Sequence, residues 1–193
     1  SLPDSLPLRL VPGIELSTQW RNKGIHIVGL DIDLESPALQ RMVQEQHSAR
    51  IDRMQKICQR LGKLGLQVDL DTLGKNMDGS MLGRPQLASY LVETGQVESE
   101  QKAFSKYLGQ GKPGDVHSHW PDIGSVVDVI GKAGGFAVLA HPIKYRLTRT
   151  KLRELLSDFS AVGGAAMEIV CGRQIPSDTR HMSELCREFG LHA

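Results

Sequence analysis

A short apolar run that ends in a histidine constrains this chain more than any other feature. Residues 137–140, Ala-Val-Leu-Ala, are followed directly by His141 and Pro142, and two glycines at 134–135 precede the run. Because the pattern before the glycines is helical, we interpret the run as the strand of an αβ unit. Polar residues at the carboxyl ends of strands are where the chemistry of β/α folds collects. His141 is therefore the first candidate functional residue.

Two other apolar runs carry side chains of metal-binding type. Residues 8–16 deliver Glu15 after a Pro-Gly-Ile segment, and residues 25–32 carry His26 between two isoleucines. Imidazole and carboxylate groups are common ligands of divalent transition metals. The strand context shared by Glu15, His26 and His141 predicts one metal site. Taken singly, each has an ordinary alternative, namely an exposed glutamate, a buried core histidine, or a histidine bonded to a loop.

Composition narrows the class of protein. A chain of 193 residues, 40% of them hydrophobic, can bury a substantial core. The net charge of +1 gives no reason to expect nonspecific binding of long duplex DNA. Three scattered cysteines without a C-x-x-C pair suit a reducing compartment, so we expect a cytoplasmic protein. Since no apolar run approaches the roughly 20 residues that span a bilayer, we expect no membrane partner.

A helical block follows the first two predicted strands and the polar loop at 17–24 between them. Ser36 and Pro37 are typical of a helix start, and apolar residues then recur every three or four positions until Gly65. We interpret the charged residues of this long helix as a solvated face. Further helices are predicted at 85–94 and 99–108, with a loop at 71–83. Residues 35–118 are therefore predicted to be a helical insertion domain.

The remaining chain alternates between helix and strand. The expected elements, in order, are a helix capped by Asp122 and reaching residue 133, a strand at 136–140, a helix at 150–160, a strand at 166–170, a helix capped by Ser177 and reaching residue 189, and the start of another strand at 191–193. This order predicts an α/β fold, an incomplete distorted β/α barrel or a parallel sheet. Residues 1–34 and 119–193 would form it, interrupted by the insertion.

Several cationic side chains are candidates for binding an anion. Gly83-Arg84-Pro85-Gln86 opens a predicted helix, so a guanidinium and free backbone N–H groups would lie close together. Lys112 follows Gly111, and the Lys144-Tyr145-Arg146 segment comes shortly after His141. Taken singly, Lys112, Lys144 and Arg146 are better explained as solvated surface, whereas for Arg84 the two interpretations are nearly balanced.

Other reactive residues give weaker signals. His117 and His119 are spaced as a metal pair, but in a loop of unknown shape this spacing has little specificity. Cys171 has no activating neighbour in the sequence, which indicates a structural thiol. The sequence contains no P-loop, nucleophile elbow or dinucleotide-binding fingerprint.

Three stretches of the chain resemble the PHP (polymerase and histidinol phosphatase) superfamily. They are Pro-Gly-Ile-Glu-Leu-Ser at 12–17, Ile-His-Ile-Val-Gly-Leu at 25–30 and Ala-His-Pro at 140–142. The chain is most similar to the TrpH/YciV-type (RNase AM-like) branch. The resemblance runs over nearly the whole chain and includes Gly-Arg-Pro at 83–85 and Tyr-Leu-Gly-Gln-Gly-Lys at 107–112.

The resemblance implies a distorted β/α barrel that holds up to three divalent metal ions. Manganese is the usual metal, with iron, zinc or magnesium as alternatives. The implied reaction is hydrolysis of 3′,5′-nucleoside bisphosphates, or of the 5′ ends of short RNA, by metal-activated water. By the same resemblance, Glu15, His26 and His141 would be metal ligands.

The same resemblance implies a phosphate site in the insertion. Arg84 would hold the substrate phosphate, with Gln86 and Lys112 as further contacts. The branch usually has histidine where this chain has Gln86, and an amide cannot act as a cation. Segment 115–117 also departs from the aromatic-valine-proline sequence of relatives, which leaves the preferred substrate open.

The family pattern also continues beyond both ends of this sequence. Its first His-x-His motif, with an aspartate and a further histidine, would lie before Ser1, and its Gly-Ser-Asp-x-His motif would follow Ala193. The opening Ser-Leu-Pro-Asp resembles neither a translation start nor a signal peptide. We therefore expect a fragment that is inactive by itself. Ligands left without their metal would also make it marginally stable, or leave a sheet edge for a partner to cover.

Two other functions are compatible with the same residues. A PHP-type phosphatase could act on another small phosphate ester, such as an amino-acid-pathway intermediate. From a different class, the chain could be a metal-free binding module whose helical block is the working surface. Metal content and phosphatase activity distinguish all three.

Overall fold

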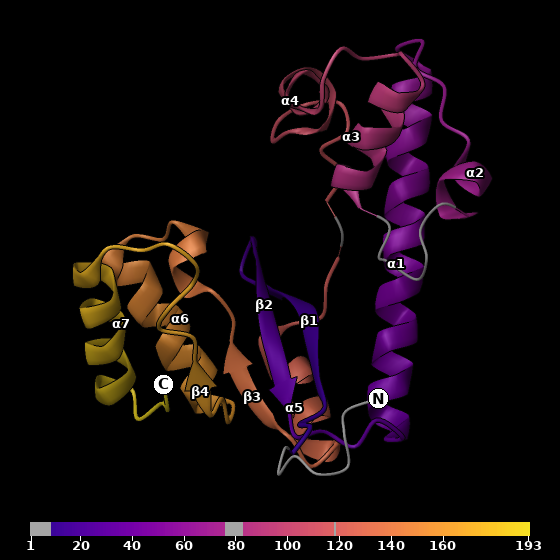
Figure 1. The fold of residues 1–193 in the computed structure, drawn as a ribbon. Helices are drawn as coiled ribbons and strands as arrows, with labels where there is room; N and C mark the ends of the chain where they lie inside the picture. Colours follow the sequence, from indigo (N-terminus) through magenta and orange to yellow (C-terminus); the bar gives the residue numbers. More distant parts are fainter. Residues whose placement is uncertain (1–8, 76–82, 118) are drawn as a thin grey trace. The chain divides into compact units, whose positions relative to one another are not determined.

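The computed structural model describes residues 9–75, 83–117 and 119–193. The chain divides into two compact units, one made of Ser1–Gln44 and Trp120–Ala193, and the other of Glu45–His119 (unit 1 and unit 2 below). Figure 1 shows the sheet of unit 1 and the helices of unit 2. Leu8 of the first predicted strand and residues 76–82 of the predicted loop lie outside the described residues.

Unit 1 begins with a β-hairpin. β1 (Gly13–Trp20) and β2 (Lys23–Leu30) pair antiparallel, with Trp20 opposite Lys23. The predicted loop at 17–24 is therefore wrong, because both strands extend through it and only residues 21 and 22 turn. Arg21 adopts a φ of 52°, the left-handed conformation that such short connections use. The polar residues of this segment suggested a loop, but some of them are buried in β1. Thr18 is 0% exposed, and its Oγ1 donates to the carbonyl of Pro121.

The sheet of unit 1 is mixed rather than parallel. β3 (Phe136–Leu139) pairs antiparallel with β2, and β4 (Ala166–Met167) pairs parallel with β3, giving the order β1-β2-β3-β4. The α/β class is confirmed, but the expected all-parallel arrangement is not, because a two-residue connection can only join antiparallel neighbours. β4 is shorter than the predicted strand at 166–170. His192 forms a parallel bridge with Ala166, as the predicted strand start at 191–193 requires.

Three α-helices lie wholly within the described part of unit 1. They are α5 (Ile123–Lys132), α6 (Arg149–Ala161) and α7 (Pro176–Glu188). Asp122 caps α5 as predicted, since its side chain accepts from the backbone N–H of Ser125. At α7 the predicted cap is wrong: Pro176 occupies the first helical turn and the N-cap position is Ile175. The proline fixes the helix start one residue before Ser177.

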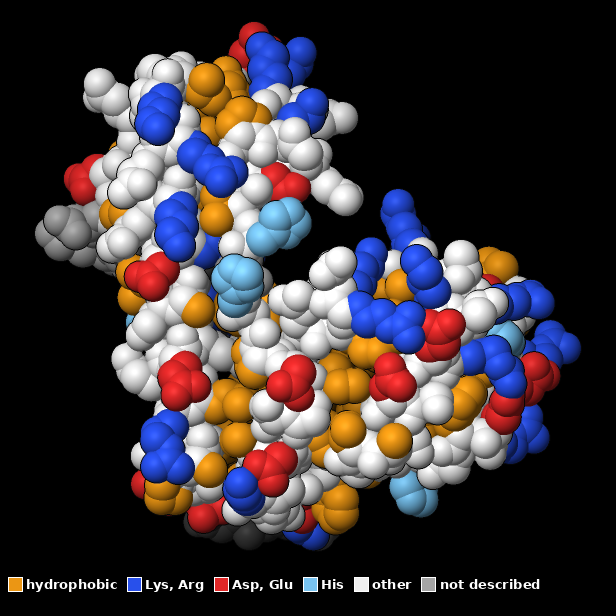
Figure 2. All heavy atoms as spheres, turned by 180° about the vertical axis from the view of Figure 1, so that it is seen from behind, with side chains coloured by type: hydrophobic (Ala, Val, Ile, Leu, Met, Phe, Trp, Pro, Cys, Tyr) orange, Lys and Arg blue, Asp and Glu red, His pale blue; other side chains and the backbone are white. Residues whose placement is uncertain are grey.

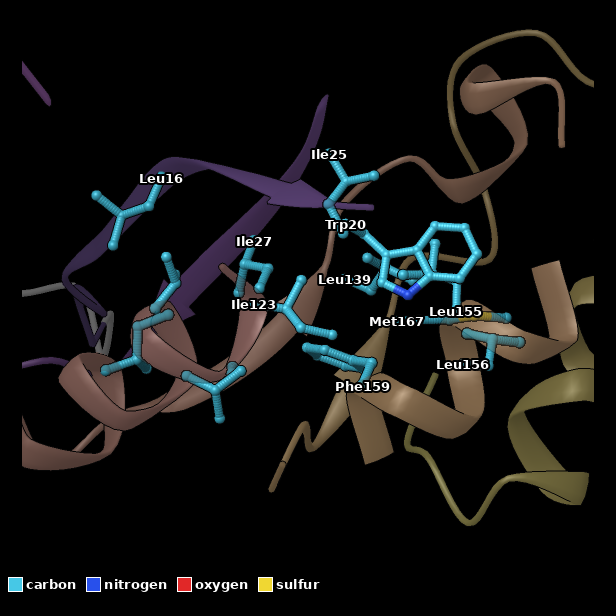
Figure 3. Packing of buried hydrophobic residues seen from close by; sticks show 14 of the residues in the cluster. Leu16, Trp20, Ile25, Ile27, Ile123, Leu139, Leu155, Leu156, Phe159 and Met167 are labelled. Atoms are coloured by element: carbon cyan, nitrogen blue, oxygen red, sulfur yellow. The ribbon is translucent and has the colours of Figure 1, made fainter. Parts of the chain in front are cut away.

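The core of unit 1 lies against one face of the hairpin. Leu16, Trp20, Ile25 and Ile27 are buried on this face, and α5 contacts β1, β2 and β3. Figure 3 shows these side chains together with those of α6, among them Phe159. The indole Nε1 of Trp20 donates to Asp158 of α6 at 2.7 Å. Because side chains alternate along a strand, the opposite face of the hairpin carries Glu15 and His26.

Unit 2 is helical. α1 (Pro37–Gly62) begins in unit 1 and continues into unit 2, followed by α2 (Leu70–Lys75), α3 (Arg84–Glu93) and α4 (Glu100–Ala103). The predicted helix at 99–108 continues beyond α4 as a π-helical turn, Phe104–Leu108, closed by the N–H of Gly109 donating to the carbonyl of Phe104. The start of the predicted loop at 71–83 is wrong, because Asp69 accepts from the N–H of Thr72 and begins α2.

The surface carries both signs of charge. Figure 2 shows acidic and basic side chains over each of the two units, in keeping with the net charge of +1. In the part of the chain that the structure covers, no helix combines the length and apolar character needed to cross a membrane.

Candidate metal centre

Glu15, His26 and His141 converge beside the sheet in unit 1, on the face of the hairpin opposite the core. His26 Nδ1 lies 2.6 Å from Glu15 Oε1, and His141 Nε2 lies 3.3 Å from the same oxygen. The two imidazole nitrogens are 3.2 Å apart. The sequence therefore identified three residues that the fold brings together, although their role as metal ligands remains a prediction.

Strand register explains why the first two side chains meet. Glu15 pairs with Val28, and His26 pairs with Ser17, so Glu15 and His26 are diagonal neighbours on one face of the hairpin. A shift of one residue in either strand would send one of them to the core face. The buried residues on that core face, such as Leu16 and Ile27, therefore fix the register that the site requires.

His141 reaches the site through an unusual backbone. It follows β3 directly and has φ 32° and ψ 53°, in the left-handed region that residues other than glycine rarely adopt. Pro142 then begins a short 3-10 helix, η2 (Pro142–Tyr145). The backbone N–H of His141 donates to Glu168 Oε2 at 2.6 Å, just after β4. The carboxylate thus supports a conformation that the chain would otherwise disfavour.

Tyr145 contacts both histidines. Its hydroxyl accepts from the backbone N–H of His26 at 2.8 Å and donates to the carbonyl of Ala140 at 2.8 Å. Its ring packs edge-on against that of His141, with 5.4 Å between the centroids. Burial raises the pKa of the Tyr145 phenol, so the group remains a proton donor at neutral pH.

The environment of Glu15 favours its charged form. Burial by itself raises the pKa of this carboxyl, but the hydrogen bond with His141 and the charge of His26 outweigh it, and the pKa is lowered. The rings of His26 and His141 meet edge to face, with centroids 5.1 Å apart. The site therefore presents an anionic oxygen between two imidazole nitrogens.

This donor set suits a divalent transition metal. The carboxylate oxygen and the two imidazole nitrogens lie within 4.8 Å of one another, and they are the only group of three or more such ligands found among the described residues. Nitrogen and oxygen donors of this kind are used by zinc, manganese and iron sites. Within the same described residues, the buried Nδ1 of His141 has no hydrogen-bond partner, so its Nε2 alone is engaged in the cluster.

The residues predicted to bind substrate phosphate all belong to unit 2. Arg84 Nη1 donates to the carbonyl of Leu108 at 3.0 Å and lies 3.7 Å from Asp115. Gln86 Oε1 accepts from the N–H of Gly83 and thereby caps the first turn of α3. Lys112 is exposed. Gln86 thus has a structural partner that its sequence position did not indicate, whereas Lys112 is accessible.

The weaker candidates behave as ordinary residues. His117 and His119 are exposed and join no group of three metal-type ligands within the described part of the chain. Burial, followed by the neighbouring Glu168, raises the pKa of the Cys171 thiol. Cys171 is therefore not an activated nucleophile, in agreement with its expected structural role.

Two further residues, neither of them predicted from the sequence, contact the histidines. Glu168 is a carboxylate directly after a strand, the same signal that pointed to Glu15, but the strand was expected to continue to residue 170. Tyr145 was noted only for its cationic neighbours. Its position four residues after His141 gave no sign that η2 would return its hydroxyl to the strands.

Comparison with known proteins gives the site a context. No protein-family model matches the chain. A 5′-3′ exoribonuclease of Haemophilus influenzae is 37% identical over 184 residues, which are 95% of this chain and 67% of that protein. The chain belongs to the PHP-type phosphoesterases. The 5′-3′ exoribonuclease Rnm of Escherichia coli is 38% identical over 188 residues, covering 97% of this phosphoesterase chain and 64% of the relative.

A third relative has a different named activity. The 3′,5′-nucleoside bisphosphate phosphatase of Chromobacterium violaceum is 35% identical over 182 residues, or 94% of the chain. The phosphoesterase chain thus spans 61–67% of the length of these relatives.

Solved structures agree with the fold. An amidohydrolase from Chromobacterium violaceum, with bound sulfate and no metal, is 34% identical with a TM-score of 0.83 and covers 94% of this phosphoesterase chain and 64% of its own. A protein from Bifidobacterium adolescentis described as a metal-dependent phosphoesterase has a TM-score of 0.79 at 22% identity, over 95% of this chain and 65% of its own. The second likeness concerns the fold alone.

Proposed function

We propose that this chain is part of a metal-dependent phosphoesterase acting on nucleotides. Its substrates would be 3′,5′-nucleoside bisphosphates or the 5′ ends of short RNA. The observation that carries the proposal is the convergence of Glu15, His26 and His141, whose ligand atoms lie within 4.8 Å of one another. The sequence predicted the same three residues from their strand contexts.

The named activities of the relatives support this substrate class. Two are 5′-3′ exoribonucleases and one is a 3′,5′-nucleoside bisphosphate phosphatase. In both activities the bond that breaks is a phosphate ester of a nucleotide. One site that holds a phosphate next to a metal would serve either substrate, so we propose the class rather than one member.

In this proposal Glu15, His26 and His141 hold a divalent transition metal, with manganese as the first choice. Such ions, when bound, supply an activated water and neutralise charge on phosphoryl oxygens. The residues themselves preorganise the site: the lowered pKa of Glu15 keeps an anionic ligand available, and Glu168 fixes the backbone of His141. Preorganised ligands avoid reorganisation when the substrate arrives.

Arg84 and Lys112 would supply positive charge for the substrate phosphate. Arg84 is anchored through one guanidinium nitrogen to Leu108, which limits its freedom before any ligand binds. Lys112 has no such anchor among the described residues. Gln86, whose amide oxygen is engaged with Gly83, would contribute through its NH₂ group or through the helix start that it caps.

Two measurements test the proposal. The purified protein is loaded with Mn²⁺, dialysed and analysed for metal, and phosphate release is then followed with adenosine 3′,5′-bisphosphate and with a 5′-phosphorylated RNA tetranucleotide. We expect retained manganese, and its loss in His141→Ala. His47→Ala, which removes an exposed histidine of α1, serves as the matched control and should retain the metal.

The alternatives predict other results. A PHP-type phosphatase for another small ester would retain metal and hydrolyse p-nitrophenyl phosphate but not the nucleotides. A metal-free binding module would retain no manganese, and His141→Ala would then match the unmodified protein. Retained metal together with hydrolysis of either nucleotide substrate supports the proposal. Absence of retained metal counts against it.

A further inference from the structure

The ladder between β2 and β3 is interrupted beside the two histidines. These strands pair antiparallel through Ile27 and Leu139, and the same register places His26 opposite Ala140. The backbone N–H of Ala140 donates to the carbonyl of His26 at 3.1 Å. In an antiparallel pair of this type the two residues exchange two such bonds. The second bond would run from the N–H of His26 to the carbonyl of Ala140.

The hydroxyl of Tyr145 takes the place of that second bond. It accepts from the N–H of His26 and donates to the carbonyl of Ala140, at 2.8 Å in both cases. One hydroxyl provides one proton and two lone pairs, so it can satisfy a donor and an acceptor together. The inserted oxygen therefore bridges β2 and β3 where a direct bond would otherwise draw them together.

This bridge lies next to both imidazoles. It holds the main chain of His26 itself and the carbonyl that directly precedes His141. The Tyr145 ring also packs edge-on against the ring of His141. The separation of the two backbones and the orientation of one imidazole thus depend on the same side chain. The two imidazole nitrogens end up 3.2 Å apart.

The backbone of residues 141–146 turns back so that Tyr145 reaches this position. Left-handed residues stand on both sides of η2, His141 with φ 32° and Arg146 with φ 51°. Within the turn, the N–H of Lys144 donates to the carbonyl of His141 at 2.9 Å. Tyr145 is only 7% exposed. A buried, doubly bonded hydroxyl at the end of a tight turn has little freedom to lie elsewhere.

We propose that Tyr145 is a positioning residue of the metal centre, whose hydroxyl, inserted between β2 and β3, sets the mutual geometry of His26 and His141. This inference rests on the proposed function only in treating those histidines as metal ligands. Residues that orient metal ligands through hydrogen bonds, without touching the metal themselves, commonly change metal affinity by about 10–100-fold when they are replaced. Tyr145 differs from the usual case because it acts on the backbone of its histidines rather than on their ring nitrogens.

The test compares Tyr145→Phe with Tyr90→Phe. Both changes remove one phenolic oxygen that accepts from a backbone N–H, because Tyr90 accepts from Asp69 at 3.2 Å in unit 2. Each variant and the unmodified protein are titrated with Co²⁺, followed by the visible absorption of the ion, which reports ligand geometry. Imidazole resonances of His26 and His141 are recorded by NMR in the metal-free proteins.

We expect Tyr145→Phe to weaken Co²⁺ binding by about tenfold or more and to change the shape of the absorption band. In the metal-free protein it should shift the resonances of both histidines and speed hydrogen exchange at the amide of His26. Tyr90→Phe should leave all of these unchanged. A variant with p-aminophenylalanine at position 145, which restores a donor on the same ring, should recover part of the affinity.

Each result bears on one claim. Tyr145→Phe that matches the unmodified protein in the NMR resonances overturns the positioning role, whether or not metal binds. Unmodified protein that binds no Co²⁺ contradicts the proposed metal site, while shifted histidine resonances would still support the role of the bridge. If Tyr145→Phe does not fold, the p-aminophenylalanine variant supplies the comparison. Its amine restores the donor to Ala140 but accepts only weakly from the N–H of His26, so the amide of His26 should still exchange faster than in the unmodified protein. Unchanged exchange at that amide would overturn the positioning role.

Discussion

The carboxylate of Glu168 accepts a hydrogen bond of 2.6 Å from the backbone N–H of His141. The bond joins the chain just after β4 to the chain just after β3, two strands that run parallel. It holds His141 at the point where the backbone turns into the left-handed region. A residue absent from the predicted ligand set thus decides how one of the predicted ligands is presented.

Replacing Glu168 with alanine should loosen the backbone at His141. Because hydrogen bonds to charged groups contribute about 1.5–3 kcal/mol and Glu168 is exposed, we expect a loss of about 1–2 kcal/mol in the free energy of unfolding. Urea unfolding measures this loss. Glu168→Gln keeps an acceptor oxygen and should lose less. Equal losses in the two variants would show that the bond to His141 is not the cause.

Asp122 gives a prediction that depends on pH. Hydrogen bonds from the backbone and side chain of Ser125 lower the pKa of Asp122 in the folded state. A group with a lowered folded pKa stabilises the protein above its unfolded pKa, about 3.9, and loses that effect as pH falls through the lower folded value. We expect Asp122→Ala to cost about 1 kcal/mol at pH 7 and less below pH ~4.

Asp122→Asn is the control for this measurement. Asparagine is a good N-cap without a titrating carboxyl, so it should retain most of the stability at pH 7 and show no acid-dependent loss from this position. Thermal melts at pH 7 and pH 3 give both comparisons. A cost for Asp122→Ala that is the same at both values would contradict the assigned role.

Two glycines of unit 1 should respond in opposite directions to alanine. A Cβ at Gly164 would lie 2.3 Å from Cε1 of Phe159, which is fully buried, whereas a Cβ at Gly131 in α5 would meet no atom within 4 Å. We expect Gly164→Ala to destabilise the protein by about 1–3 kcal/mol through overpacking. Gly131→Ala should stabilise it by about 0.5–1 kcal/mol. Chemical denaturation tests both, and a stabilising Gly164→Ala would contradict the packing described.

Lys112 allows a test of the proposed phosphate site without damage to the fold. Its side chain is exposed, so Lys112→Ala should leave the melting temperature unchanged. If the ammonium contacts the substrate phosphate, the dissociation constant for adenosine 3′,5′-bisphosphate should rise about tenfold, equivalent to about 1.4 kcal/mol. Lys106→Ala, at another exposed lysine of unit 2, is the control. Equal affinities in the two variants would remove Lys112 from the site.

Strand and helix periodicity predicted much of unit 1. The apolar run before His141 is β3, and Asp122 caps α5 as expected. The errors occurred where polar residues occupy regular structure. Ser17, Thr18 and Gln19 were assigned to a loop, yet they belong to β1 because their polar groups find partners within the fold. Thr18 and Gln19 both donate to the carbonyl of Pro121, more than 100 positions away in the chain, which no local pattern contains.

The candidate site, too, could be predicted only in part from the sequence. Glu15, His26 and His141 were recognisable because each is a ligand-type residue in or after an apolar strand. The distances between their ligand atoms could not be predicted, since these distances follow from the hairpin register and from the left-handed turn at His141. Glu168 was missed because the strand before it was expected to continue to residue 170, and Tyr145 because a hydroxyl has no signature until a backbone group lies opposite it.

The sequence by itself determined which residue types are available for chemistry and which segments can bury an apolar face. The alternation of apolar and polar residues and the spacing of apolar residues in helices are local properties, so they can be recognised without knowledge of the fold. Tertiary structure alone decided that β3 pairs antiparallel with β2 and parallel with β4, and that a tyrosine bridges two strands beside the histidines. The reason is physical: hydrogen bonds and ligand geometry depend on distances between residues far apart in the chain, and only the packed core fixes those distances.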